Sequence, residues 1–457
     1  MKLAILGGGG VRIPAFIRGV LGGPIAGAFD EIALFEPNQV RRETMGQLSA
    51  WVAQCLGRPE AVTVTDDLEA ALDAADFVFS AIRVGGDQAR VIDEEVALRR
   101  GLVGQETTGS GGCAMALRTI PVLLSYCKVI ARCAPRAVLI NFTNPAGLIT
   151  QAVSLHSNVA VVGVCDTPAQ TVASLAAFLG AQQAGIGYSY SGLNHCGWVT
   201  SLTIEGEEQV GQLLDRYEEL ARTDHTFGGF DPVSVRRTGA IPTEYVYYYD
   251  DPQRYVDAVA RAGTSRGQDV ALFNEKLLTA VAKALSDGSP YDAWLAYSDI
   301  MGMRSATYMR TDTGAEPLVS QPSADDAEDH RPIGYEGVAL AVIDGLTGRH
   351  PGQVVINTRN GSALGFLDPD DTVEVPALVH GGGVAPLATA PLPQSARGLI
   401  TCIKAYEREV VSAAVSGDAS LAAHALALHP LVPGVTVARE MLNEYRERHG
   451  RHLAYLQ

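Results

Sequence analysis

Short apolar runs alternate with helical segments rich in alanine and leucine over the first part of the 457-residue chain. The runs are Leu3–Leu6, Glu31–Glu36, Val62–Val64, Phe77–Ser80, Val138–Asn141 and Val159–Val164. Apolar strands that alternate with helices predict a parallel sheet covered on both faces. We therefore expect an α/β fold in which residues 1–180 form a Rossmann-like, doubly wound domain.

The pattern changes after about residue 181, where strands begin to alternate between apolar and polar side chains. The expected antiparallel strands are Tyr188–Leu193 and Trp198–Ile204, the expected helices lie around Leu399–Ala414 and Val435–Arg448, and Pro317–Pro332 is typical of a surface loop. A chain of this length exceeds the usual size of one hydrophobic core. We therefore expect a second, α+β domain over residues 181–457.

The composition argues against several classes of protein. A hydrophobic content of 47% with 19% charged residues is typical of a compact fold. The net charge of −16, without a stripe of Lys and Arg, argues against a nucleic-acid partner. The chain lacks an uninterrupted run of about 18 apolar residues, so we expect no membrane span. The seven cysteines are scattered without a CxxC pair, and we expect a reduced, cytoplasmic setting.

A glycine-rich turn directly follows the first expected strand. Gly7, Gly9 and Gly10 lie in this turn, where the backbone can approach a pyrophosphate at the start of the next helix. The third position of the usual dinucleotide fingerprint is not glycine, so the full pattern is not met. Glu36 ends the second strand, close to where an acidic residue would bind the ribose hydroxyls. We expect NAD at this turn, and the sequence leaves NADP open.

Cys165 and His195 each follow an expected strand, and thiolate and imidazole are common metal ligands. Their spacing matches no metal-binding motif, so simple packing in the core is the alternative for both. Asp166 stands between Cys165 and Thr167-Pro168. Because proline at the first helical position makes Thr167 the expected N-cap, Asp166 is left to serve chemistry or to offset the helix dipole.

Two further groups of residues carry candidate chemistry. Tyr245 and Tyr247–Tyr249 crowd together, which ordinarily indicates packing or an interface. One of these tyrosines could act as a general base only if a cation lowered its pKa from about 10. Arg83 and Arg90 flank Gly85-Gly86 beyond the carboxyl end of a strand, the side on which α/β sheets bind ligands. A surface salt bridge is the alternative for these arginines.

Taken together, these segments resemble the NAD- and metal-dependent glycoside hydrolases of family 4, and they are most similar to the 6-phospho-β-glucosidase branch. The similarity extends over nearly the whole chain. The motifs that carry it are Arg83–Gly86, Gly104–Gly109, Asn141–Gly147, Gly192–His195, Ile241–Tyr245, Val373–Pro376, Lys404–Glu407 and His429–Val432. So many motifs in one order make a chance match very unusual.

The resemblance implies a reaction that differs from the two-carboxylate mechanism of most glycosidases. In this family NAD takes a hydride from C3 of the sugar, and the resulting ketone acidifies the proton on C2. A base removes that proton, the leaving group departs from C1, water adds and the hydride returns. Such chemistry needs a metal ion that polarises the C3 oxygen and a nicotinamide placed against C3.

By the same resemblance, Cys165 and His195 become the metal ligands, with Mn²⁺ as the usual ion of the family. Thiolate and imidazole would by softness suit Zn²⁺ better, so the choice of Mn²⁺ comes from the resemblance alone. Tyr245 falls where the family places its C2 base, and a nearby metal gives a reason for a lowered pKa. The second domain is therefore expected to bind substrate and metal.

The resemblance assigns roles to further residues by position. The expected contacts are Arg83, Arg90, Asn144 and Asn194 with the substrate, Arg83 also with the cofactor, and Glu106 and Asp166 with the reaction centre. Asp166 matches the acid of the phospho-α-glucosidase branch, whereas the β branch often has asparagine there. The anomer that this chain cleaves is therefore left open.

Two departures from the family pattern concern the phosphate of the substrate. The family often has a serine hydroxyl in the glycine turn, where this chain has Gly10-Val11-Arg12 instead. Glu336 stands where a carboxylate would repel a sugar 6-phosphate unless Arg12 or Arg331 compensates. A small 6-phosphorylated glucoside is the expected substrate, and a non-phosphorylated sugar is the alternative.

Two other functions remain open at the level of sequence. A malate- or lactate-type dehydrogenase would share the dinucleotide-binding domain but would oxidise a hydroxy acid or sugar without returning the hydride. A sugar-nucleotide sensor would use the fold only for binding, although the joint presence of Cys165, Asp166, His195 and Tyr245 argues against it. A homodimer or homotetramer is expected from the family.

Overall fold

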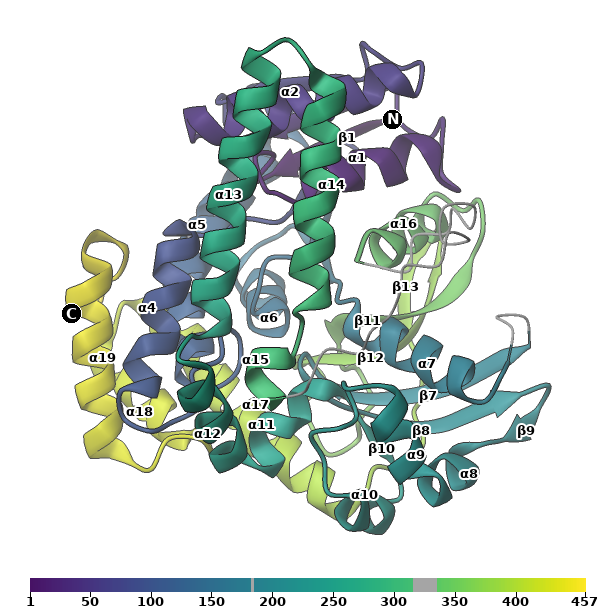
Figure 1. Ribbon diagram of the computed structural model, residues 1–457, viewed down its shortest axis with the longest axis vertical. Helices are drawn as coiled ribbons and strands as arrows, with labels where there is room; N and C mark the ends of the chain where they lie inside the picture. The colour runs from purple at the N-terminus through teal and green to yellow at the C-terminus, as the bar shows by residue number, and fades with distance from the viewer. Residues whose placement is uncertain (182–184, 315–334) are drawn as a thin grey trace.

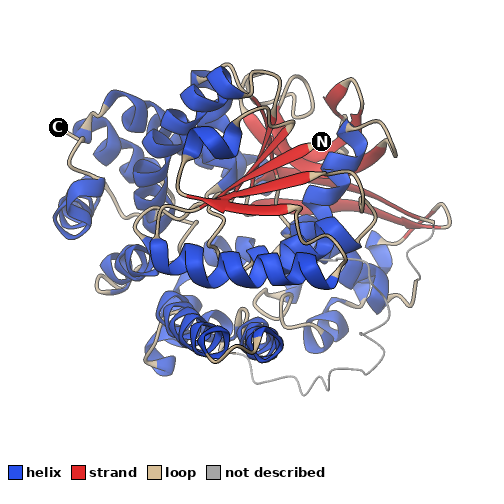
Figure 2. Ribbon diagram, turned by 90° about the horizontal axis from the view of Figure 1, so that it is seen from above, coloured by secondary structure: helices blue, strands red, loops and turns tan. Residues whose placement is uncertain are grey.

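The computed structural model describes residues 1–181, 185–314 and 335–457, and side chains from residue 337 onward in the last range. The expected loop Pro317–Pro332 lies outside these residues, as do Arg331 and the side chain of Glu336. Within the described chain, the strands form one 13-stranded sheet with helices on both faces (Figures 1 and 2).

The N-terminal part of this sheet is parallel and runs in the order β3-β2-β1-β4-β5-β6. Its strands are β1 (Lys2–Leu6), β2 (Glu31–Phe35), β3 (Val62–Thr65), β4 (Phe77–Ser80), β5 (Val138–Asn141) and β6 (Ala160–Gly163). This is the strand order of Rossmann domains, in which ligands bind beyond the carboxyl ends at the point where the order reverses. The reversal lies between β1 and β4. The expected fold class is confirmed.

Helices cover both faces of the parallel strands, which explains why the strands are apolar throughout. They are α1 (Ile13–Gly22), α2 (Gln39–Cys55), α3 (Leu68–Leu72), α4 (Gly86–Leu98), α5 (Ser110–Cys133), α6 (Ala146–His156) and α7 (Thr167–Phe178). In β1, Ala4 and Leu6 pack into one core, whereas Leu3 and Ile5 pack into the other with Phe16 of α1. Successive side chains of a strand point to opposite faces, so both faces require apolar residues.

The sheet continues beyond β6 through antiparallel strands. These are β7 (Ile186–Leu193), β8 (Cys196–Ile204), β9 (Glu207–Glu208), β10 (Ile241–Pro242), β11 (Gly352–Arg359), β12 (Thr372–His380) and β13 (Gly383–Pro386). The order after β6 is β11-β12-β7-β8-β10, with β13 beside β12 and β9 beside β8. The expected boundary near residue 180 therefore separates two groups of strands that share one sheet. That boundary stays a prediction.

The helices of the C-terminal part include a long antiparallel pair, α13 and α14, that packs against α2 (Figure 1). The helices are α8 (Val210–Asp215), α9 (Tyr217–Thr223), α10 (Pro232–Thr238), η1 (Glu244–Val246), α11 (Tyr247–Asp250), α12 (Pro252–Ala262), α13 (Arg266–Ser286), α14 (Pro290–Ala306), α15 (Arg310–Thr313), α16 (Tyr335–Leu346), α17 (Gln394–Ser416), α18 (Ala419–Leu428), α19 (Val435–His449) and η3 (Gly450–His452). Met45 and Leu48 of α2 contact the pair in a small apolar core. The second part thereby reaches back over the first.

One described helix, α5, is long and apolar enough to cross a membrane by length and composition. However, 61% of its most apolar window is buried inside the fold, where Leu117, Ile120 and Leu123 belong to the main core. This burial is typical of a central helix of a folded domain.

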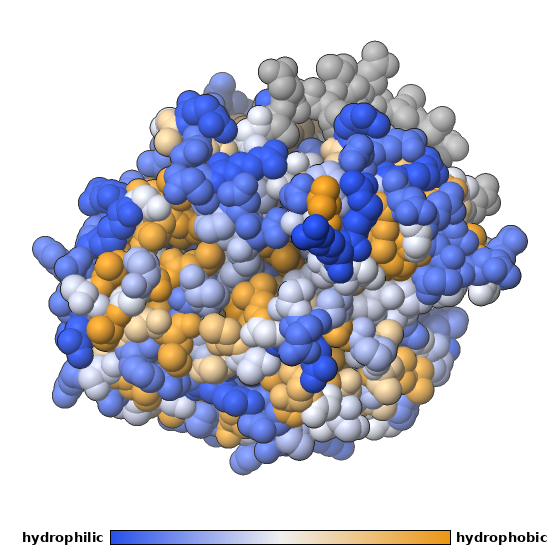
Figure 3. All heavy atoms as spheres, turned by 90° about the horizontal axis from the view of Figure 1, so that it is seen from below, coloured by the Kyte–Doolittle hydropathy of each residue, from blue (hydrophilic) through white to orange (hydrophobic). Residues whose placement is uncertain are grey.

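On the face shown in Figure 3, apolar side chains are interspersed with polar ones. All seven cysteines are free thiols.

Candidate active site

The side chains of Cys165 and His195 meet beyond the carboxyl end of the parallel strands. Cys165 follows β6, His195 lies between β7 and β8, and the Cys165 Sγ–His195 Nε2 distance is 3.7 Å. A metal ion bound at about 2.3 Å from a sulfur and about 2.1 Å from a nitrogen, in tetrahedral geometry, separates the two by about 3.6 Å. The two side chains are therefore close enough to bind one cation.

The backbone and hydrogen bonds fix the orientation of His195. It occupies a two-residue turn between the paired residues Leu193 and Cys196, with a left-handed φ of 61°. That conformation costs a non-glycine residue about 1–2 kcal/mol, a strain that is typical of functional positions. His195 Nδ1 lies 2.7 Å from Thr107 Oγ1, and Thr107 Oγ1 donates to Gln105 Oε1 at 2.8 Å.

This chain of hydrogen bonds assigns the tautomer of His195. Because the Thr107 hydroxyl donates its proton to Gln105, it accepts the Nδ1–H of His195, and the lone pair of Nε2 faces Cys165. Burial lowers the pKa of His195 to about 3, so the ring is neutral near pH 7. A neutral imidazole with a free Nε2 lone pair is the form that binds a metal.

The residues around this pair leave ligand positions for other groups. Within the described chain, no set of three or more His, Cys, Asp or Glu side chains is arranged to hold a metal ion. Burial, aided by the charges of Glu374 and Asp166, raises the pKa of the Cys165 thiol well above its usual value. A bound cation favours the thiolate, and a catalytic metal keeps positions open for substrate or water. The pair fits a metal ion of this kind.

Tyr245 lies directly against the imidazole. The rings of His195 and Tyr245 are stacked, with centroids 3.7 Å apart and an interplanar angle of 5°. Burial and the charge of Glu244 raise the pKa of Tyr245 well above its usual value. The lowered pKa that a tyrosine base needs therefore depends on the cation that the neighbouring pair is placed to bind.

Asp166 occupies a different position in the helix than the sequence predicts. Helix α7 begins at Thr167, and Asp166 is the N-cap residue, without a capping hydrogen bond from its side chain. The expectation that Thr167 caps the helix is wrong, because its hydroxyl donates to Glu244 Oε1 at 3.1 Å instead. Asp166 Oδ2 accepts from Gln170 Nε2 at 3.1 Å, and the carboxylate lies beside Cys165.

Glu106 is held between Arg83 and Arg90. Arg83 donates to Glu106 Oε2 at 2.6 Å, and Arg90 lies 3.0 Å from Oε1. Burial opposes ionisation of Glu106, but the two arginine charges lower its pKa to about 2. Arg90 is buried and also pairs with Glu94 at 2.8 Å. The alternative of a surface salt bridge is therefore wrong for Arg90, which belongs to a buried network.

Further arginines surround this network. Burial, and then the charges of Arg12, Arg90, Arg266 and Arg83, lower the pKa of Arg304 to about 9. Arg304 donates to the side-chain amide oxygen of Asn274 at 3.1 Å. This partner is neutral, so the bond does not balance the charge of the guanidinium group. Such a concentration of guanidinium groups suits a phosphate or pyrophosphate.

The glycine turn after β1 has the geometry of a nucleotide site. Gly7 has a φ of 88°, and a Cβ on Gly9 would stand 2.6 Å from Cγ of Glu36. Gly10 N donates to the carbonyl of Gly7 at 2.9 Å and closes the turn. Glu36 is buried and its two carboxylate oxygens accept from Gly9 N at 3.1 Å and Asn38 N at 2.9 Å. The turn and the acid are therefore hydrogen-bonded to each other at the position where a Rossmann domain binds a dinucleotide.

The two asparagines of the expected substrate site differ in their surroundings. Asn144 follows β5, and its Oδ1 accepts from Ala146 N at 3.3 Å at the start of α6. Asn194 Nδ2 donates to Glu374 Oε1 at 3.1 Å, and the same oxygen accepts from Asn357 at 2.9 Å. Tyr190 donates to Glu374 Oε2 at 2.7 Å. Glu374 thus holds the turn that carries Asn194 and His195.

Several contributors to this site are not among the residues predicted from the sequence. They are Thr107, Glu244, Arg304, Glu374 and Tyr308, whose hydroxyl lies 3.3 Å from that of Tyr245. Glu374 is the charged residue of an apolar segment, Val373–Pro376. A charged residue among apolar neighbours in a strand is a sequence signal that could have identified it. Arg304 and Tyr308 lie in and after α14, where no local pattern distinguishes them. Only the fold brings them to this site.

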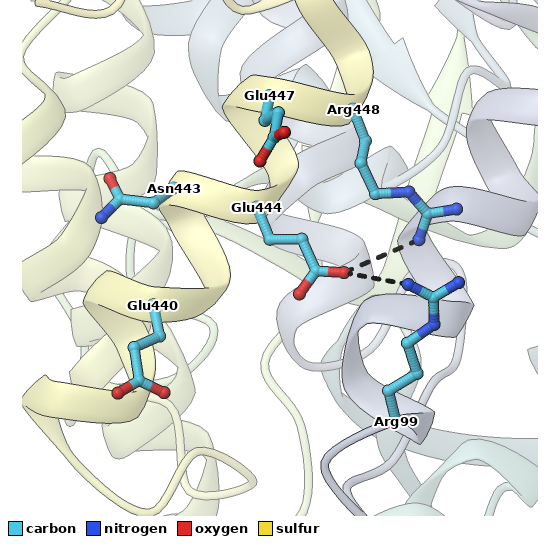
Figure 4. Close-up of a pocket in the computed structure, with 6 residues that line it drawn as sticks. All are labelled: Arg99, Glu440, Asn443, Glu444, Glu447 and Arg448. Carbon is cyan, nitrogen blue, oxygen red and sulfur yellow. Dashed lines mark hydrogen bonds and ion pairs between the residues drawn. The ribbon is translucent and has the colours of Figure 1, made fainter.

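A hollow of about 560 Å³ lies elsewhere, between α4 and α19. Figure 4 shows Glu444 of α19 between Arg99 and Arg448, at 3.5 and 3.8 Å. None of the predicted site residues lines this hollow, and its arginines are already paired with Glu444. The region around Cys165 is therefore the better candidate for catalysis.

With this geometry established, comparison with known proteins identifies the class of the chain. The model of the "Family 4 glycosyl hydrolase" matches residues 2–181, and the model of the "Family 4 glycosyl hydrolase C-terminal domain" matches residues 190–432. The chain belongs to family 4 of the glycosyl hydrolases. The resemblance drawn from the motifs is confirmed.

Curated relatives match over almost their whole lengths. A "Probable 6-phospho-beta-glucosidase" of Bacillus subtilis is 29% identical over 99% of this chain and 97% of the relative. A 6-phospho-beta-glucosidase of Thermotoga maritima is 25% identical over 98% of each chain. A phospho-alpha-glucosidase of Clostridium acetobutylicum is 24% identical over 98% of this chain and 97% of the relative. Relatives with both anomeric names are therefore similar to this chain.

Solved structures share the fold. A 6-phospho-alpha-glucosidase from gut microorganisms, in complex with NAD and glucose-6-phosphate, has a TM-score of 0.81 at 25% identity and covers 98% of this chain and 97% of that one. The Thermotoga maritima 6-phospho-beta glucosidase, with manganese, NAD+ and glucose-6-phosphate, has a TM-score of 0.79 at 24% identity and covers 98% of both chains. The second likeness concerns the fold alone.

The network around Glu374 predicts a dependence of stability on pH. Burial raises the pKa of Glu374 to about 7, despite the hydrogen bonds from Tyr190, Asn194 and Asn357. The folded protein therefore holds this proton between about pH 4.5 and 7, where the unfolded chain has lost it. Stability is lost as the pH rises through this window, by up to about 3 kcal/mol.

Glu374→Gln removes the titrating group but keeps an oxygen acceptor, so the variant should lack this loss. We expect urea unfolding at pH 5 and pH 8 to show a smaller decrease in unfolding free energy for Glu374→Gln than for the wild type. Glu440→Gln, at an exposed position on α19, is the control. Parallel pH dependences in all three proteins would contradict the assignment.

Proposed function

We propose that the chain is an NAD- and divalent metal-dependent glycosidase that cleaves a small 6-phosphorylated glucoside by transient oxidation of the sugar at C3. The observation that carries the proposal is the meeting of a thiol, a neutral imidazole and a phenol at Cys165, His195 and Tyr245. Membership of family 4 supports the reaction type. The names of the similar phosphoglucosidases support the substrate class.

The residues suited to hold the cofactor and the ion follow from the site. Gly7, Gly9 and Gly10 would bind the pyrophosphate, and Glu36 the ribose. Cys165 and His195 would hold a divalent ion, with Mn²⁺ as the proposed metal; a relative of the same fold is named as a complex with NAD and Mn2+. When bound, NAD supplies a reversible hydride acceptor and the ion supplies a Lewis acid.

The protein groups would then divide the proton transfers between them. Tyr245, stacked on His195, would take the proton from C2 of the sugar. Asp166, beside Cys165, would in its carboxylic acid form give a proton to the oxygen of the leaving group and end as the carboxylate. Glu106 is ionised between Arg83 and Arg90 and would keep these arginines in place near the substrate. Asn144 and Asn194 would bind sugar hydroxyl groups.

The cluster of guanidinium groups supports the phosphate on the substrate. Arg12, Arg266 and Arg304 lie near Arg83 and Arg90, and the charge of Arg304 is destabilised by its neighbours. A phosphate dianion would relieve this repulsion. Arg12, in the segment Gly10-Val11-Arg12 that lacks the family hydroxyl, would then contribute a positive charge to phosphate binding. A 6-phosphorylated glucoside of either anomer therefore suits this site better than a neutral sugar.

The remaining parts of the proposal rest on the sequence and on family membership. A cytoplasmic location and a homodimeric or homotetrameric assembly stay predictions. The main competing function, a dehydrogenase of the malate or lactate type, differs in its use of the cofactor, because it would release NADH in step with product. No specific contact in the site favours that function over the glycosidase.

A direct assay separates these functions. Four nitrophenyl glucosides, α and β, with and without a 6-phosphate, would be incubated with NAD, Mn²⁺ and a reductant. We expect nitrophenol from a phosphorylated substrate of one anomer, loss of activity on chelation and recovery with Mn²⁺. NADH should not accumulate, because each turnover returns the hydride. NADH formed in proportion to product, or no cleavage under any condition, would overturn the proposal.

Arg304→Gln tests the phosphate site. Loss of one charge-assisted hydrogen bond costs about 1.5–3 kcal/mol, so KM for the phosphorylated glucoside should rise by about 10- to 100-fold. We expect a smaller change in kcat, because Arg304 would bind the phosphate equally strongly in the bound substrate and in the transition state. Arg99→Gln, at the distant hollow, is the control. An unchanged KM in Arg304→Gln would place the phosphate elsewhere.

A further inference from the structure

A line of hydroxyl groups leads from Tyr245 to a buried carboxylate. The hydroxyl of Tyr308 lies 3.3 Å from that of Tyr245 and donates to Glu244 Oε1 at 3.1 Å. Tyr308 comes from the segment between α14 and α15, whereas Glu244 and Tyr245 belong to η1. Tyr245, Tyr308 and Glu244 thus form a continuous line of hydrogen-bond contacts, although they come from two separate parts of the chain.

The surroundings of Glu244 are unusual for a carboxylate. Its side chain is buried, and Oε1 accepts from Thr167 Oγ1 at 3.1 Å in addition to Tyr308. The ion pairs of the described residues include none to Glu244, although a buried charge usually has one. Burial, with a contribution from the charge of Asp166, raises the pKa of Glu244 to about 7.

A carboxylate with these properties can accept and release a proton near neutral pH. The ring of Tyr245 stacks on the imidazole of His195, and its hydroxyl lies within hydrogen-bond distance of the Tyr308 hydroxyl. Tyr308 can therefore take a proton from the oxygen of Tyr245. A purely structural role for Glu244 would be to fix Thr167 at the start of α7. Such a role would not require the second hydrogen bond from Tyr308.

We propose that Tyr308 and Glu244 are positioning residues that carry protons to and from Tyr245 during removal of the C2 proton. This inference rests on the proposed function, in which Tyr245 is the base at C2. As the C2–H bond breaks, its electron pair stays on the sugar and its proton joins the oxygen of Tyr245. Tyr245 passes its phenolic proton to the Tyr308 oxygen, and Tyr308 passes its own proton to Glu244.

The transfer is balanced and reversible. One O–H bond forms for each bond to hydrogen that breaks, and the carboxylate of Glu244 ends as the carboxylic acid. Return of the proton along the same line restores all three side chains when C2 is protonated again. No electron is transferred in this step, so no oxidant or reductant is needed. The bound cation would favour loss of the phenolic proton of Tyr245, and the line of hydroxyl groups gives that proton an acceptor.

Three variants separate this relay from a structural role. Tyr308→Phe removes the middle hydroxyl, and Glu244→Gln keeps an oxygen that accepts from Thr167 and Tyr308 but cannot take a proton. Tyr248→Phe is the matched control, because Tyr248 is a buried tyrosine whose ring lies 6.0 Å from that of Tyr245 and whose hydroxyl donates to Asp312 Oδ2. Tyr245→Phe marks the complete loss of the base.

The experiment measures deuterium incorporation at C2 from D2O, with NAD, Mn²⁺ and the 6-phosphorylated nitrophenyl glucoside that the wild type cleaves. General base catalysis contributes about 10²- to 10⁴-fold, so we expect exchange to fall by at least about 100-fold in Tyr308→Phe and Glu244→Gln. KM, NAD binding and Tm should stay close to the wild-type values, and Tyr248→Phe should keep its exchange within about 3-fold.

A proton inventory in H2O and D2O mixtures adds a readout that packing would not change. The wild type should show a curved inventory, from several protons in motion, and Tyr308→Phe should show a linear one. Exchange close to the wild-type rate in either Tyr308→Phe or Glu244→Gln would overturn the relay, as would an equal loss in Tyr248→Phe. Absence of exchange in the wild type would instead overturn the proposed function together with the relay.

Discussion

The contact between the Cys165 thiol and the His195 imidazole is the feature on which the rest of the site depends. These groups come from opposite sides of the junction in the sheet, since β6 and β7 are separated by β11 and β12. Their 3.7 Å separation is therefore set by strand registers, such as Asn357 opposite Gly163 and Glu374 opposite Gly192. A shift of one residue in either strand register would move the His195 imidazole away from the Cys165 thiol.

The charges and protonation states of the buried side chains determine which ligands the site can bind. The metal pair is buried and neutral without a cation, because burial keeps the proton on the thiol and off the imidazole. Several guanidinium groups gather around Glu106, and their charges keep its carboxylate ionised. One part of the proposed site thus suits a cation and the other suits a phosphate. A phosphorylated sugar beside NAD and a divalent ion satisfies both.

Much of the fold and part of the site could be predicted from the sequence. The apolar strands of residues 1–180 have the pattern of a doubly wound sheet, and Gly7, Glu36 and Cys165 stand at strand ends, where sequence position largely fixes spatial position. The pairing of Cys165 with His195 came from the resemblance to family 4, because their spacing alone indicates nothing. The continuous sheet was not predicted, since β11 and β12 insert between β6 and β7 from far along the chain. Arg304 and Tyr308 contribute through tertiary contacts that leave no local pattern, and Glu244 lies in the motif Ile241–Tyr245, from which only Tyr245 was predicted to be a site residue.

The central claim is that Cys165 and His195 bind one metal ion, and cobalt substitution tests it most directly. Co²⁺ would be added to the metal-free protein with NAD, and the near-ultraviolet absorption of a thiolate–cobalt bond would be followed. The account predicts this band in the wild type and in Cys196→Ser, a buried neighbouring thiol, and its loss in Cys165→Ser. A wild type without the band, or a Cys165→Ser variant that retains it, would contradict the account.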